Sequence, residues 1–167
     1  MTVERVAPPL AAQEREMLNA WLDFHRDTLA RKCEGLTDEQ LRQRAVPPSS
    51  MSLLGLVRHM AEGEFQWFRL VLGRQELPWP YYTDDNPDAD FDDVAGADVA
   101  EAFAVWRGEC GAARERVAAA PSLDTTGTQE GKEYSLRWIM VHMIEEYARH
   151  NGHADLIRER IDGTVGV

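Results

Sequence analysis

Four long segments of the chain carry apolar residues at intervals of about three, four or seven, and this periodicity most constrains the fold. The segments cover residues 10–34, about 50–73, about 98–120 and 135–161. No segment alternates apolar and polar residues as a half-buried strand would. The sequence therefore predicts an all-α fold, an antiparallel four-helix bundle with long connecting loops.

Residues at the segment ends support these boundaries. Gly35 is placed to end the first helix, and Thr37 followed by Gln40 resembles a capping box that opens a short helical turn. Pro121 follows the third segment, and Ser135 is a suitable N-cap for the fourth. We therefore expect helix ends close to these residues.

The stretch between the second and third segments, residues 75–93, contains three prolines and an acidic run. We expect no regular element there, and a long crossover connection is a known variant of a helical bundle. The acidic run lacks the spacing of a calcium-binding loop, which favours a solvated loop. Its members are Asp84, Asp85, Asp88, Asp90, Asp92 and Asp93.

Size and charge narrow the function classes. A chain of 167 residues with 44% hydrophobic residues can fill one core, so we expect a single domain over residues 1–167. A net charge of −11 argues against nucleic acid as a partner. The sequence shows neither a signal-peptide pattern nor a run of eighteen apolar residues, so we expect a cytoplasmic protein without a membrane partner. Cys33 and Cys110 suit buried, reduced thiols and not nucleophiles.

Histidine and glutamate residues on two helices point to a metal site. His142, Glu146 and His150 follow one another at four-residue steps on one helix face. His59 is the one histidine of the second helix and lies on or near its apolar stripe. Glu146 and His150, one turn apart, form the best pair with His59 opposite, although His142 could replace one of them. Three such ligands suit a divalent transition metal with open coordination positions.

Simpler interpretations of the same residues stay open. His59 could be a hydrogen-bonded core histidine, and Glu146 could pair with Arg149 or Arg158. In that case the bundle holds no metal. His25 is predicted at the surface or at a helix end. The aromatic group formed by Trp67, Phe68, Trp106 and Trp138 is predicted to lie in the core, with a pocket wall as the alternative.

Two stretches resemble the DinB-like superfamily: SLLGLVRHMAEGEFQWF at residues 52–68 and HMIEEYARHNGHADLIRE at residues 142–159. In that group, and in the related mycothiol-dependent maleylpyruvate isomerases, a second-helix histidine and two residues one turn apart on a later helix hold a divalent metal. The resemblance implies His59, Glu146 and His150 as the ligands. It implies a supporting or pocket-wall role for His153.

The resemblance also implies the chemistry. The isomerases carry an additional C-terminal domain, whereas this sequence ends at Val167 after the fourth segment. We therefore expect the broader role of the superfamily, metal-dependent S-transfer from a low-molecular-weight thiol such as mycothiol or bacillithiol to a small electrophile. The alternative is a non-catalytic, stress-related metal-binding bundle. Zinc is the metal that we expect first. Nickel, iron and manganese accept the same ligands and are the alternatives. The resemblance further implies a homodimer.

Overall fold

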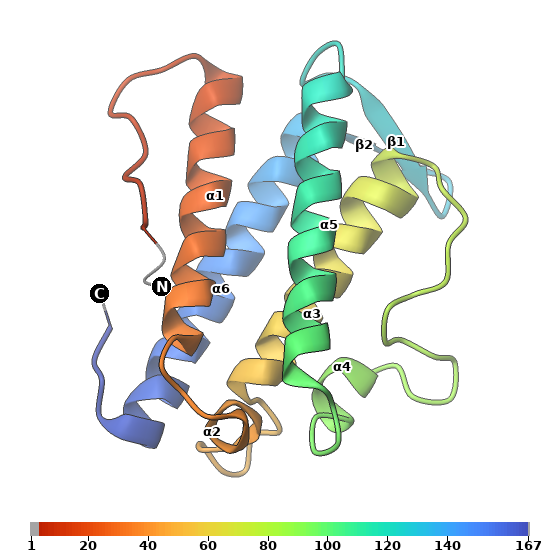
Figure 1. Cartoon of the computed structure of the whole chain (residues 1–167). Helices are drawn as coiled ribbons and strands as arrows, with labels where there is room; N and C mark the ends of the chain where they lie inside the picture. Colours follow the sequence, from red (N-terminus) through yellow and green to blue (C-terminus); the bar gives the residue numbers. More distant parts are fainter. Residues whose placement is uncertain (1–3, 167) are drawn as a thin grey trace.

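The computed structural model describes residues 4–166; the ends of the predicted single domain, residues 1–3 and 167, lie outside these described residues. The chain is mostly helical, as the periodicity predicts. The long helices are α1 (Glu14–Cys33), α3 (Leu53–Glu64) with its continuation η1 (Phe65–Leu72), α5 (Val99–Ala119) and α6 (Leu136–Asp162). Short helices α2 (Asp38–Arg42) and α4 (Ala89–Asp92) lie near one end of the long helices (Figure 1).

The long helices lie side by side, two in each direction. The colours of Figure 1 show that α1 and α6 run one way along the molecule and that α3 and α5 run the other way. Helix α1 packs mainly on α6, α3 packs on α5, and α3 also contacts α6. The loop after η1 returns the chain to the end of the molecule where α3 begins (Figure 1), which is what the predicted crossover requires.

The helix boundaries follow from local capping. The Thr37 hydroxyl accepts the backbone N–H of Gln40, and the Gln40 side chain accepts that of Thr37, so the predicted capping box is confirmed. Ser135 accepts the N–H of Trp138 and begins α6 as predicted. Helix α6 ends at Gly163, whose φ of 80° places it in the left-handed conformation typical of a helix C-terminus.

Three predictions about local structure are wrong. Helix α1 begins at Glu14 and not near residue 10, because the fully exposed Leu10 gains nothing from helical packing. The loop after η1 contains one helical turn, α4, whose carbonyl oxygens at Ala89 and Asp90 accept hydrogen bonds from the buried Arg58 side chain. These tertiary contacts stabilise a turn that the local sequence does not indicate.

The third error is a β-hairpin that the sequence pattern did not predict. Strands β1 (Thr126–Gln129) and β2 (Lys132–Ser135) pair antiparallel, with Thr126 opposite Ser135. Glu130 and Gly131 both have positive φ values, 52° and 75°, as a two-residue hairpin turn of type I′ requires. The strands are short and largely polar, so they lack the alternation by which a longer strand is recognised.

A buried polar network joins the four long helices. Arg26 of α1 donates to both carboxylate oxygens of Glu64 at the end of α3, over 2.8 and 2.7 Å. The Tyr147 hydroxyl of α6 donates to Glu64 over 2.8 Å and accepts from Trp106 of α5. The network fixes α6 relative to α3, the two helices that carry the predicted ligands. No helix among residues 4–166 is long and apolar enough to cross a membrane.

Candidate functional site

The three predicted ligand residues lie together between α3 and α6. One nitrogen of His59, one nitrogen of His150 and one carboxylate oxygen of Glu146 all lie within 4.8 Å of one another. The ring centroids of His59 and His150 are 4.7 Å apart with an edge-to-face orientation. His150 Nε2 lies 3.4 Å from Glu146 Oε2, across one turn of α6. The fold therefore brings these donor atoms together, although His59 and Glu146 are 87 positions apart in the chain.

Asp90 sets the orientation of His59. Its Oδ2 atom lies 2.8 Å from His59 Nδ1, and its Oδ1 atom accepts the backbone N–H of Phe91. A ring that donates Nδ1–H to Asp90 leaves Nε2 as its acceptor atom, which is the arrangement found in most metal-binding histidines. Asp90 is only 4% exposed, so the prediction that it belongs to a solvated acidic loop is wrong. The α4 turn buries it against α3.

His150 is held in its neutral form. Burial is the main cause that lowers the pKa of His150 to about 4, and the nearby His59, His153 and Arg149 side chains lower it further. A neutral imidazole keeps a lone pair available for a metal ion. His150 Nδ1 lies 3.3 Å from Nδ1 of His153, which places His153 directly behind the cluster and agrees with the supporting position that the resemblance implies.

Glu146 also belongs to a second group of possible ligands. Atoms of His142, Glu145 and Glu146 lie within 4.8 Å of one another, all on α6. Glu145 is exposed and pairs with Arg149, which also lies 3.3 Å from Glu146. The group of His59, Glu146 and His150 comes from two helices and is more buried than the group on α6, so it would surround a bound ion more completely. The salt bridge considered for Glu146 exists with Arg149, beside the contact with His150.

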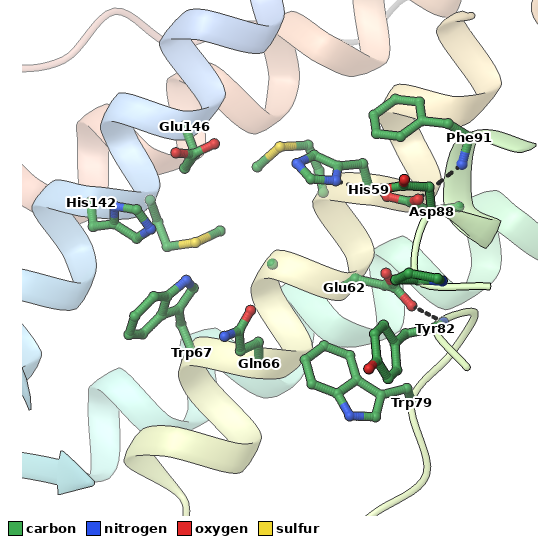
Figure 2. A pocket seen from close by; sticks show the side chains of 15 residues that line it. His59, Glu62, Gln66, Trp67, Trp79, Tyr82, Asp88, Phe91, His142 and Glu146 are labelled. Carbon is green, nitrogen blue, oxygen red and sulfur yellow. Dashed lines mark hydrogen bonds and ion pairs between the residues drawn. The ribbon is translucent and has the colours of Figure 1, made fainter. Parts of the chain in front are cut away.

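A pocket of about 500 Å³ opens beside His59 and Glu146. Figure 2 shows His142 and Glu146 of α6 on one side, facing His59, Glu62, Gln66 and Trp67 of α3 and η1. Trp79 and Tyr82, from the loop after η1, cover another side (Figure 2). The π-helical turns of η1 follow Glu64 directly, and wide turns of this kind are frequent at functional sites.

Glu62 ties that loop to the pocket. Its buried carboxylate accepts the backbone N–H groups of Tyr81 and Tyr82. Burial raises the pKa of Glu62, whereas these hydrogen bonds favour the charged form. The side chain thus holds the backbone of Tyr81 and Tyr82 beside the pocket, and the Trp79 ring packs against the Tyr82 ring.

The aromatic predictions are partly right. Phe68 and Trp106 lie in the core. Trp67 lines the pocket instead, and the centroids of its ring and the His142 ring are 4.9 Å apart. Trp138 is 44% exposed, so its assignment to the core is wrong. Its ring stacks on the His142 ring with the two centroids 4.8 Å apart. His25 lies in the middle of α1, so its placement at a helix end is wrong; the residue is half-buried, and Asn151 of α6 donates to its carbonyl oxygen.

The residues present fit a divalent metal ion. Two imidazole nitrogens and one carboxylate are a common donor set for zinc, iron and nickel, and the supporting carboxylate of Asp90 is already in place. The pocket beside the donors leaves room for water or substrate at further coordination positions.

Three acidic residues of the site escaped the sequence interpretation. Glu62 lies one helical turn after His59, so its spacing was a usable signal. Asp90 is 31 positions from His59 and its contact depends on the course of the loop, so no spacing rule points to it. Asp88, which also lines the pocket, is hidden within the acidic run in the same way.

Comparison with known proteins assigns the chain to a family. A comparison with individually curated proteins gives no match. A family model described as Mycothiol-S-transferase matches residues 17–163, which include all four long helices except the first three residues of α1. This match agrees with the resemblance to the DinB-like superfamily. The chain therefore belongs to the mycothiol S-transferase family, a DinB-like family.

Proposed function

We propose that this protein is a metal-dependent S-transferase that joins mycothiol, or a related low-molecular-weight thiol, to a small electrophile. The observation that carries the proposal is the convergence of His59, Glu146 and His150 within 4.8 Å beside an open pocket. The family assignment supports the thiol and the transfer reaction. Zinc is the metal we propose first, because two imidazoles and a carboxylate with open positions suit it well.

The roles of the residues follow from their positions. His59, Glu146 and His150 would hold the ion, which when bound would supply positive charge that lowers the pKa of a thiol. Asp90 orients His59, while Trp67 and Trp79 provide apolar walls for the electrophile. The thiolate sulfur forms a bond to the electrophilic carbon as the leaving group departs with its electron pair. Neither Cys33 nor Cys110 takes part, since both are buried.

The frame of the site is, in our proposal, a four-helix bundle. The pairing of α1 with α6 and of α3 with α5, and the two helices in each direction, support it. The two directions require the long loop after η1 as a crossover, and that loop supplies Trp79, Tyr82 and Asp90 to the pocket region.

The second candidate function is a metal-binding module without catalysis, stress-related or involved in dimer interactions. A purely structural site is usually closed by four protein ligands. The open pocket beside the three donors therefore favours the enzyme.

The test is a conjugation assay with mycothiol and N-benzylchloroacetamide, in which the reaction rate is measured by the release of chloride. The zinc-loaded protein should raise the rate above the protein-free rate, and His150→Ala should abolish the increase. Asp85→Asn, a change in the exposed loop away from the pocket lining, serves as the control. A zinc-loaded protein that leaves the rate unchanged would support the non-catalytic module.

A further inference from the structure

The pocket wall is acidic and aromatic, and it lacks cationic side chains. Its carboxylates are Glu62, Asp88, Asp90 and Glu146, and no Lys or Arg of the described residues lines it. An anionic ligand in the pocket therefore meets carboxylates and aromatic rings and no Lys or Arg side chain of the described residues.

A bound metal ion does not reverse this charge. A divalent ion neutralises two of the four carboxylates. Even with Glu62 protonated, three carboxylates would outnumber its two positive charges, and a thiolate would add a further negative charge. The chain as a whole carries a net charge of −11, which acts in the same direction. The formal charge of the side chains that line the pocket, counted together with the ion, therefore stays negative in each of these states.

Asp88 is the carboxylate best placed to meet a ligand. Asp90 is engaged by His59, Glu62 by two backbone N–H groups, and Glu146 by Arg149 and His150. Asp88 is exposed, and within residues 4–166 its carboxylate has no hydrogen-bond or ion-pair partner.

The aromatic rings complete a surface suited to a cation. Trp79 and Tyr82 lie 5.3 Å apart between ring centroids and line the same pocket as Asp88 (Figure 2). The faces of such rings attract positive charge, and their apolar area binds a planar hydrocarbon body.

We propose that this pocket selects electrophiles that carry no negative charge, binds aromatic electrophiles with an ammonium group best, and uses Asp88 as the main determinant of this preference. The inference rests on the proposed function, since it names the class of its second substrate.

Three N-benzylchloroacetamides test the inference, with a para aminomethyl, methyl or carboxylate group on the ring. In each reaction the sulfur–carbon bond forms, the carbon–chlorine bond breaks and chloride leaves with its electron pair. One unit of charge close to a partly solvated carboxylate changes affinity by roughly tenfold. We expect kcat/KM with mycothiol to fall from the cationic to the neutral to the anionic compound, by roughly tenfold at each step.

Binding provides a readout that does not depend on turnover. The corresponding unreactive N-benzylacetamides should quench the fluorescence of Trp67 and Trp79 in the zinc-loaded protein without thiol, with the same order of affinity. Asp88→Asn should narrow the difference between cation and anion, and Asp88→Lys should reverse it. Asp85→Lys makes the same change in net charge three residues away, outside the pocket lining, and should leave the order unchanged.

The outcomes separate the two proposals. If no compound is turned over but the binding order and its reversal by Asp88→Lys are found, the S-transferase function fails and the charge selection stands. If turnover occurs but the anionic compound binds as well as the cationic one, the charge selection is overturned and the function stands. An effect of Asp85→Lys as large as that of Asp88→Lys would also overturn it, because the preference would then arise from net charge alone.

Discussion

Asp90 and His59 make the hydrogen bond on which the geometry of the site most depends. The carboxylate holds the ring with Nε2 free, and metal-bound histidines that lose such a partner lose about tenfold or more in metal affinity. We therefore predict that Asp90→Asn weakens zinc binding by about tenfold, because asparagine keeps the shape but removes the charge. A competition titration with a chromophoric chelator measures this.

Asp92→Asn is the matched control, since Asp92 lies on the same helical turn, is exposed and pairs only weakly with Arg44 over 3.9 Å. It should bind zinc as the wild type does. Equal affinity in the wild type and Asp90→Asn would show that Asp90 does not support a metal ligand.

The two cysteines should be inert in the folded protein. Burial raises the pKa of both Cys33 and Cys110 to about 12, so only about one thiol in ten thousand is ionised at pH 8. We predict negligible reaction with Ellman's reagent in the native state and modification of both thiols in urea. Rapid modification of either thiol in the native protein would bring back a cysteine nucleophile as a candidate.

At the scale of the elements, the buried ion pair between α1 and α3 should contribute strongly to stability. Glu64 has no exposed side-chain surface and meets Arg26, Tyr147 and Cys110. Glu64→Gln would leave the charge of Arg26 buried without its counter-charge, so we predict a loss of about 3 kcal/mol in the free energy of unfolding. Urea denaturation measures the change.

Asp23→Asn gives the comparison for that network, because Asp23 meets Arg26 and Arg114 but is 42% exposed. Asp23→Asn should lower the free energy of unfolding by less than about 1 kcal/mol. The double variant Arg26→Met with Glu64→Leu should recover much of the stability, since it removes both buried charges. A Glu64→Gln variant as stable as the wild type is the result that would contradict this role.

The hairpin depends on a close approach to η1. A Cβ atom on Gly127 of β1 would lie 2.2 Å from the carbonyl oxygen of Val71, a backbone atom that cannot rotate away. We predict that Gly127→Ala lowers the free energy of unfolding by about 2 kcal/mol. Gly108→Ala in α5, where no atom lies within 4 Å, should instead raise it by up to about 1 kcal/mol. A harmless Gly127→Ala would mean that the hairpin is free to move away from η1.

Periodicity predicted the long helices because their packing is regular along the sequence. Ser135 and Thr37 cap their helices through neighbouring residues, so local sequence was sufficient there. The hairpin, the α4 turn and the exposed position of Trp138 depend on contacts between distant segments. The donor set of His59, Glu146 and His150 was accessible because a helix places residues four apart on one face, whereas Asp90 reaches the site through a loop.

At the scale of the whole molecule, helices from both halves of the chain meet at one point beside an acidic, aromatic pocket. The buried network of Arg26, Glu64, Tyr147 and Trp106 holds those helices in position. A site of this kind does not depend on a partner chain for its three donors. The homodimer that the resemblance implies stays a prediction.

Elemental analysis of the untagged protein tests the central claim most directly, with wild type compared with His59→Ala, Glu146→Ala, His150→Ala and His142→Ala. We predict about one divalent ion per chain in the wild type, lost in the first three variants and retained in His142→Ala, because His142 belongs only to the second group on α6. Metal retained in His59→Ala, or lost in His142→Ala, would contradict the assignment and move the site to α6 alone.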